Sequence, residues 1–147
     1  MTTSPHVVSD GDRIYLDANA LIALVEGRNS ALATLVSSAR AGRVRVISSM
    51  LTLAEVLVGP LRSGDDGLAG SYERFFGEAS FLMAEPVTTE ILLRAARIRA
   101  ATSNRLADAI HVATAESAGC AHFLSADRRL RVFPPMVLVD FDDIGTP

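Results

Sequence analysis

The sequence has 147 residues, of which 49% are hydrophobic and 21% charged, and its net charge is −3 at pH 7. This length suits one domain with one core, and the composition excludes a disordered chain. The slight negative charge argues against an indiscriminate nucleic-acid coat, although it permits a local basic rim around an acidic site. The only cysteine, Cys120, excludes a disulfide framework and a cysteine-based zinc site, so we expect a small buried hydrophobe there.

The beginning of the chain shows neither the apolar core of a signal peptide nor a run long enough to span a membrane. We therefore expect a soluble, cytoplasmic protein with no membrane partner. Residues 1–11 predict a flexible lead-in. Ile14–Leu16 then predict a short buried strand, and an apolar run from Asn19 to about residue 25 predicts a helix.

Asp17 lies between that strand and that helix. An acid at the carboxyl end of a strand occupies the place where open α/β sheets bind their ligands. Aspartate is also a favoured helix cap, so Asp17 alone is compatible with either role.

Short apolar strands alternate with helices along the rest of the chain. We expect helices over 30–41, 49–59, around 72–76, 89–101 and 106–117, and strands over 43–48, 81–84, 122–124 and 136–139. Gly59–Pro60 is expected to break the third helix, and 63–70 to form a polar connection. This alternation predicts a three-layer α/β/α sandwich with a mostly parallel five-stranded sheet. Without a long linker, residues 1–147 are expected to form a single domain.

Four acids are expected to converge on one edge of this sheet: Asp17 and Asp127 after strands, Asp108 in the first turn of its helix, and Glu55 about two turns into the helix after the second strand. Like charges in one cleft raise each other's pKa, and a divalent cation relieves that conflict. Mg²⁺ prefers carboxylate and water oxygens, whereas the three histidines form no cluster suited to zinc. His111 lies one turn after Asp108, and we expect it to pack or hydrogen-bond rather than to ligate.

Four segments in this order and spacing resemble the PIN-domain family, and are most similar to its VapC-like toxins of type II toxin–antitoxin systems. They are IYLDANALIAL from Ile14, SMLTLAEVLVGP from Ser49, RLADAIHVATAE from Arg105 and FLSADRRL from Phe123. The resemblance implies a Mg²⁺- or Mn²⁺-dependent endoribonuclease that hydrolyses phosphodiester bonds in RNA. Its catalytic acids would be Asp17, Glu55, Asp108 and Asp127, with Asp17, Asp108 and Asp127 at the metal.

The resemblance also assigns supporting positions and partners. Asn19, Ser49 and Ser125 fall on polar positions that flank the motifs. The family implies a homodimer and a VapB-like antitoxin that inhibits the toxin by occupying its groove. Leu53, Val56 and Leu57 are candidate residues for these contact surfaces, although core packing is the more common use of such side chains.

RNA also needs positive contacts beside an acidic site. Arg128 and Arg129 follow Asp127 directly and are expected to contact phosphate. The arginines at 94, 97, 99 and 105 flank the Asp108 helix, and serve equally well as a solvated surface.

Two other functions remain open on the sequence. Asp17 after a first strand is compatible with an aspartyl-nucleophile phosphatase or phosphotransferase, but Asn19 stands where a second acid is expected and the chain has no lysine. The other is a non-catalytic binding module that acts only through an antitoxin complex.

Overall fold

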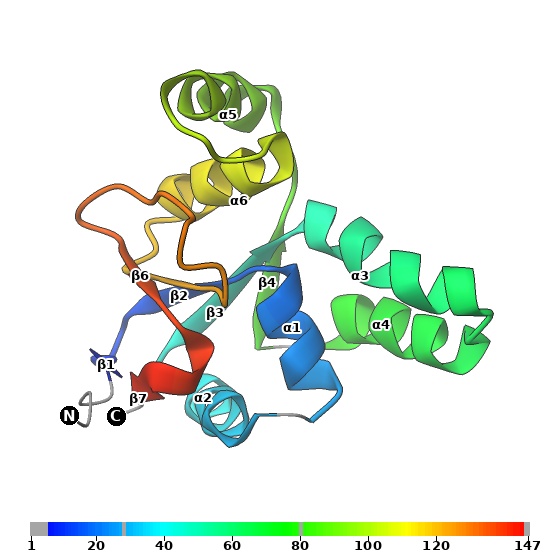
Figure 1. Cartoon of the computed structure of the whole chain (residues 1–147). Helices are drawn as coiled ribbons and strands as arrows, with labels where there is room; N and C mark the ends of the chain where they lie inside the picture. The colour runs from blue at the N-terminus through cyan, green and yellow to red at the C-terminus, as the bar shows by residue number, and fades with distance from the viewer. Residues whose placement is uncertain (1–5, 28, 80, 146–147) are drawn as a thin grey trace.

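The computed structural model describes residues 6–27, 29–79 and 81–145. Its main sheet has five strands in the order β4-β3-β2-β5-β6, and every neighbouring pair is parallel. Figure 1 shows β2 in the middle of this sheet, between β3 and β5. The strands are β2 (Arg13–Leu16), β3 (Arg45–Ser49), β4 (Leu82–Glu85), β5 (His122–Leu124) and β6 (Val137–Val139). All five lie within a few residues of the predicted ranges.

In the described part of the chain six helices cover the two faces of the sheet, which confirms the three-layer α/β/α prediction (Figure 1). α5 (Thr89–Ala101) and α6 (Leu106–Ser117) lie on one face. On the other are α1 (Ala18–Val25), α2 (Ser30–Arg40), α3 (Met50–Ser63) and α4 (Asp66–Glu78). A short 3₁₀ helix, η1 (Phe141–Asp143), follows β6.

The alternation of side chains along β2 divides the core into two clusters. Ile14 and Leu16 pack with residues of α1, α2 and α3, whereas Tyr15 packs with residues of α5 and α6. All three are fully buried, because both faces of a parallel sheet are covered by helices. The main sheet therefore places Tyr15 on the α6 side of the sheet, two residues before Asp17.

The region around Pro60 differs from the prediction. α3 continues through Gly59–Pro60 to Ser63, because Pro60 is buried on the packed face of the helix and this packing outweighs the intrinsic cost of a proline. Gly64 ends the helix with a φ of +73°, a conformation that favours glycine. Asp65 then caps α4 by accepting a hydrogen bond from the Leu68 N–H at 3.0 Å, so most of the expected polar connection is helical.

The expected flexible lead-in is also revised where the structure describes it. His6–Val7 form strand β1, which pairs in parallel with β7 (Ile144–Gly145). Val8 follows and is fully buried, and its N–H donates to the Gly145 carbonyl at 2.8 Å. Residues 1–5 of that prediction lie outside the described residues.

Two expectations from composition can be compared with the structure. Cys120 is a free, buried thiol whose pKa is raised to about 12 by burial, as expected for a small core side chain. Among the residues that the structure describes, no helix is both long and apolar enough to cross a membrane.

Candidate active site

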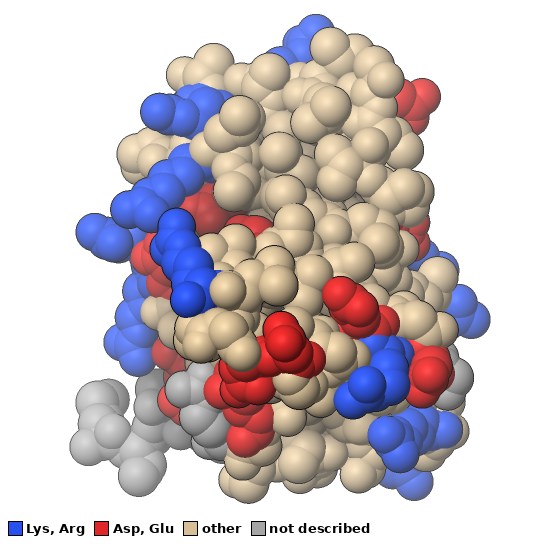
Figure 2. All heavy atoms as spheres, turned by 90° about the vertical axis from the view of Figure 1, so that its right-hand side faces the viewer, with Lys and Arg blue, Asp and Glu red and all other residues tan. Residues whose placement is uncertain are grey.

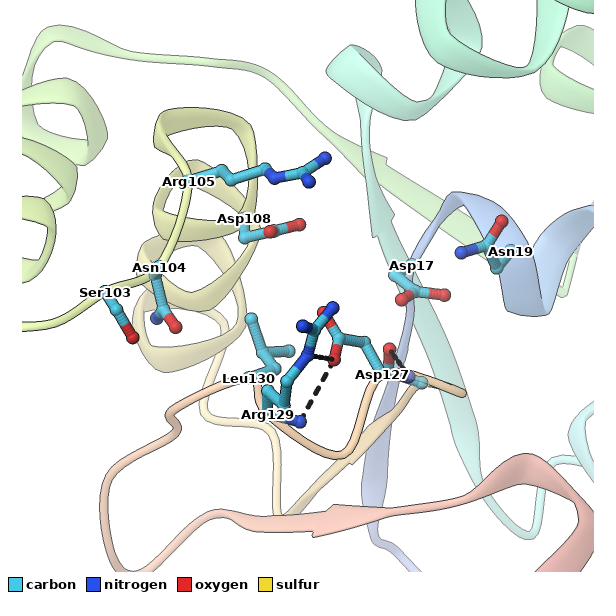
Figure 3. Close-up of a pocket in the computed structure, with 10 residues that line it drawn as sticks. Asp17, Asn19, Ser103, Asn104, Arg105, Asp108, Asp127, Arg129 and Leu130 are labelled. Carbon is cyan, nitrogen blue, oxygen red and sulfur yellow. Dashed lines mark hydrogen bonds and ion pairs between the residues drawn. The ribbon is translucent and has the colours of Figure 1, made fainter.

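A pocket of about 390 Å³ opens at the carboxyl edge of the sheet, where β2 and β5 end beside the first turn of α6. Asp17, Asp108 and Asp127 line it together, and Figure 3 shows them approaching from three separate parts of the chain. The parallel topology produces this meeting, because the carboxyl ends of neighbouring parallel strands lie at one edge.

Asp17 caps a helix and also lies in the pocket, so its position is compatible with both of the interpretations that the sequence left open. Its Oδ1 accepts a hydrogen bond from the Ala20 N–H at 2.9 Å and so caps α1, while its side chain also lines the pocket. Burial raises the pKa of Asp17, and the Asp108 charge raises it further. Hydrogen bonds from the Ser125 hydroxyl and from the Ala20 N–H lower that pKa and offset part of the rise.

Asp108 is the third residue of α6 and faces the same pocket. Burial raises its pKa, and the charges of Asp127 and Glu55 add to the rise, whereas His111 and Arg105 lower it. The acids therefore influence one another electrostatically, as expected for carboxylates gathered at one edge of a sheet.

Asp127 lies in the loop after β5 and is held by local hydrogen bonds. Its N–H donates to the Ser125 Oγ at 3.1 Å, and its Oδ1 accepts from the Arg129 N–H at 3.0 Å. The Arg129 Nε also lies 3.5 Å from this Oδ1. Since the Arg129 side chain is 91% exposed, this ion pair is weak and easily exchanged.

Glu55 is brought near the three aspartates but does not line their pocket. Its Oε1 lies 2.5 Å from the His111 Nε2, so the carboxylate is engaged with the side of α6 that faces the sheet. Glu55 nevertheless raises the pKa of Asp108, which indicates that its charge acts on the pocket. The four predicted acids thus separate into three aspartates in the pocket and one glutamate beside it.

The three predicted supporting residues separate in a similar way. Asn19 and Ser125 line the pocket, and Ser125 is buried between Asp17 and Asp127. Ser49 does not line the pocket. Its Oγ accepts a hydrogen bond from the Leu51 N–H at 3.0 Å and caps α3, the helix that carries Glu55.

Arginines surround the mouth of the pocket unevenly. Arg105 and Arg129 line it, while Arg128 lines an adjoining shallow pocket and lies 3.8 Å from Asp140. Arg94 is instead tied to Glu116 by two hydrogen bonds of 2.9 and 3.1 Å, so it stabilises the α5–α6 pair rather than the site. Only Arg105 of the four arginines that flank the Asp108 helix lines the pocket.

Sequence reasoning did not assign Ser103, Asn104 and Leu130 to the site, although they also line the pocket. Asn104 is buried, and its side-chain amide forms two hydrogen bonds of 2.9 Å with the backbone of Arg131. These bonds join the start of α6 to the loop that carries Asp127. The interruption before α6 was visible in the sequence, but its partner lies 27 residues away.

The donor set determines which ion the pocket suits. Carboxylate, amide and hydroxyl oxygens line it, which favours Mg²⁺ or Mn²⁺ over zinc. Among the described residues no three His, Cys, Asp or Glu side chains lie close enough together to hold a metal ion between them. Mg²⁺ is commonly bound by one or two carboxylates and several waters, so an open pocket of aspartates fits such an ion.

Comparisons with known proteins agree with this architecture. The chain is similar to the toxin–antitoxin complex of Klebsiella pneumoniae, at 21% identity and a TM-score of 0.65, covering 89% of this chain and 99% of that one. It is also similar to VapBC2 of Rickettsia felis bound to a promoter DNA fragment, at 14% identity and a TM-score of 0.70, covering 87% of this chain and 98% of that one.

A third similar structure is VapC20 of Mycobacterium tuberculosis, described as a toxin that cleaves the sarcin–ricin loop. Its identity is 17% and its TM-score 0.63, covering 80% of this chain and 92% of that one. No curated protein matches the chain. The PIN domain family matches residues 14–134, which span every acid of the site. This match extends over most of the 147 residues, and the chain therefore belongs to the PIN-domain family.

Proposed function

We propose that this protein is a metal-dependent endoribonuclease that hydrolyses phosphodiester bonds in RNA and acts as the toxin of a toxin–antitoxin pair. One observation carries the proposal: Asp17, Asp108 and Asp127, from three separate parts of the chain, line one pocket. The atoms there that could bind a metal ion are oxygens of carboxylate, amide and hydroxyl groups. The similarity to a toxin that cleaves the sarcin–ricin loop supports RNA as the substrate class.

Asp17 and Asp108 would hold a Mg²⁺ or Mn²⁺ ion, with Asp127 completing the site or holding its waters. When bound, this ion supplies an activated water and polarises the scissile phosphate. The raised pKa values of Asp17 and Asp108 fit this assignment, because carboxylates that repel one another gain most from a cation.

The chain's own side chains would bind the RNA backbone. Arg105 and Arg129 lie on the lining of the pocket and Arg128 beside it, so their guanidinium groups can contact phosphates on either side of the scissile bond. The weak pair of Arg129 with Asp127 leaves that guanidinium available to a phosphate. Asn19 and Ser125 offer an amide and a hydroxyl for contacts to sugar or phosphate oxygens.

A VapB-like antitoxin and a second copy of the chain are the proposed protein partners, in the cytoplasm. Figure 2 shows that a large part of one face carries no charged side chains. Exposed apolar side chains on α3 and α5 supply contact surface: Met50, Val58, Leu61, Leu92 and Leu93. Val56, which sequence analysis considered for a contact surface, is instead buried in the core.

Cleavage of total cellular RNA in the presence of Mg²⁺ or Mn²⁺, with new 5′ ends mapped by sequencing, tests the proposal. We expect a few discrete cut sites, and their loss in Asp108→Asn. The matched control is Glu73→Gln, which removes one exposed charge on α4 outside the site and should cleave as the wild type does. Cleavage of duplex DNA, or phosphate release without RNA cleavage, would refute the ribonuclease assignment.

A further inference from the structure

A buried pair of side chains, Tyr15 and His111, links Glu55 to the middle of the sheet. The Tyr15 hydroxyl lies 2.6 Å from the His111 Nδ1, and the His111 Nε2 lies 2.5 Å from the Glu55 Oε1. Tyr15 is fully buried and His111 is 2% exposed. Both ring nitrogens therefore have a partner, and all three side chains form one continuous chain of hydrogen bonds.

The direction of the hydrogen bond between His111 and Glu55 follows from its acceptor. A carboxylate only accepts, so the His111 Nε2 carries the hydrogen that is donated to the Glu55 Oε1. When the ring is neutral, the Nδ1 has no hydrogen and accepts from the Tyr15 hydroxyl; when the ring is protonated, the Nδ1–H donates to the Tyr15 oxygen. In either state the Tyr15 oxygen is the partner of the Nδ1, and the Nε2–H remains directed at Glu55.

Ring packing keeps this pair from moving. The Tyr15 ring stacks on Phe123 with centroids 4.8 Å apart and planes at 28°, and it meets His111 edge to face at 5.7 Å and 61°. Tyr15 lies on β2, just before Asp17, and Phe123 lies on β5, just before the loop of Asp127. The two strands that deliver these aspartates therefore also fix the orientation of His111.

We propose that His111 and Tyr15 are positioning residues that hold Glu55 as a water-orienting carboxylate beside the pocket, and not as a metal ligand. The His111 Nε2–H occupies the Oε1, which leaves the Oε2 to accept from a water. Glu55 also lies outside the lining of the three-aspartate pocket. The proposal rests on the proposed ribonuclease function and assigns Glu55 one role within it.

Two amide substitutions separate the two hydrogen bonds of His111, because each reproduces the position of one ring nitrogen. The glutamine amide in His111→Gln reproduces the Nε2 donor to Glu55, whereas the asparagine amide in His111→Asn reproduces only the Nδ1 position. We expect His111→Asn to lower kcat by about 100-fold, the range of a general-base contribution, with KM within about twofold. His111→Gln should retain most of the wild-type kcat.

Tyr15→Phe removes the hydroxyl that pairs with the His111 Nδ1 and should lower kcat with little change in KM. The matched control is Tyr72→Phe, at the other buried tyrosine. The Tyr72 hydroxyl donates to the Glu26 Oε2 at 3.1 Å, and neither residue lines the pocket. Tyr72→Phe should leave kcat unchanged. Equal losses of kcat in the two variants, or in His111→Gln and His111→Asn, would contradict the positioning role.

Coupling and metal affinity distinguish positioning from a structural role. In a Glu55→Gln background, His111→Asn should cause no further loss of kcat, because its effect passes through Glu55. If the kcat losses of Glu55→Gln and His111→Asn multiply in the double variant, His111 only supports the fold. Calorimetric titration with Mn²⁺ should give Glu55→Gln and His111→Asn the wild-type affinity within about twofold, while Asp108→Asn binds more weakly.

If Glu55→Gln weakens Mn²⁺ binding as much as Asp108→Asn does, Glu55 is a metal ligand and the inference fails while the ribonuclease function stands. If the wild type cleaves no RNA, the proposed function fails. In that case the ¹⁵N resonances of labelled His111 still test the tautomer, and a hydrogen on Nδ1 instead of Nε2 overturns the inference.

Discussion

Replacing Asp17 by asparagine separates its capping role from its charge. Asparagine caps helices as well as aspartate does, so the hydrogen bond from the Ala20 N–H at 2.9 Å should persist. The substitution removes a buried charge that Asp108 repels. Relief of such repulsion near a cleft contributes on the order of 1–2 kcal/mol, and loss of the favourable charge at the start of α1 costs about 0.3–1 kcal/mol. We expect a net gain of about 1 kcal/mol in the free energy of unfolding of the metal-free protein.

The sign of the pH dependence follows from the raised pKa of Asp17. A carboxyl group whose pKa is higher in the folded state binds its proton more tightly there, so the wild type loses stability as the pH rises through that range. Asp17→Asn lacks this loss. The difference in the free energy of unfolding between Asp17→Asn and the wild type should therefore be largest at pH 7. It should shrink as the pH falls toward the pKa of an unfolded aspartate, about 3.9.

Thermal melts in EDTA and in excess Mg²⁺ measure both effects. In EDTA the melting temperature of Asp17→Asn should exceed that of the wild type by about 2–4 °C. Mg²⁺ at about 100 times its dissociation constant should stabilise the wild type by about 2.7 kcal/mol and the variant by much less, which reverses the order. The matched control is Asp65→Asn, the same exchange at the exposed cap of α4, which should change little. A melting temperature of Asp17→Asn well below that of the wild type in EDTA would refute the reasoning.

Three further predictions concern the pocket. Asp108→Asn should weaken Mn²⁺ binding by about tenfold in calorimetry, equivalent to about 1.4 kcal/mol, and unchanged binding would remove Asp108 from the metal site. Arg105→Ala should raise KM several-fold. It should also reduce the slope of log(kcat/KM) against log salt concentration by about 0.7, the value for one phosphate contact on a single strand. The control is Arg97→Ala, at an exposed arginine outside the pocket. Asn104→Ala removes two hydrogen bonds to Arg131 and should lower stability by about 1–3 kcal/mol in urea titrations; no loss would mean that water replaces the amide.

The fold was predictable because its signals are local. The strands of the main sheet are short and mostly apolar, and the last residue of β3, Ser49, caps the helix that follows. Once the strands are parallel, their carboxyl ends share an edge, so the sequence predicts that Asp17 and Asp127 lie together, and both line the pocket. The prediction failed at Pro60, where burial against the rest of the molecule overrides the local tendency of Gly-Pro to end a helix.

The arrangement within the site was less predictable, because it depends on contacts between distant residues. Glu55 has the helical position of a pocket acid, but its direction is decided by His111, which is 56 residues away. Ser49 and Ser125 looked equivalent in the sequence, yet only Ser125 lines the pocket, since Ser49 points its oxygen to the start of its own helix. The sequence showed the interruption at Asn104 but not its partner, because the partner is the backbone of Arg131 and any residue type supplies that.

The bonds of Asn104 restrict how long the loop that carries Asp127 can be. Surface loops generally tolerate inserted or deleted residues. The segment from Asp127 to Arg131 is anchored at one end by the Ser125 hydroxyl and at the other by the Asn104 amide. One added residue within it would either release Arg131 or move Asp127 out of the pocket. Laboratory evolution of this protein should therefore accept substitutions at the exposed positions of this segment but reject changes in its length.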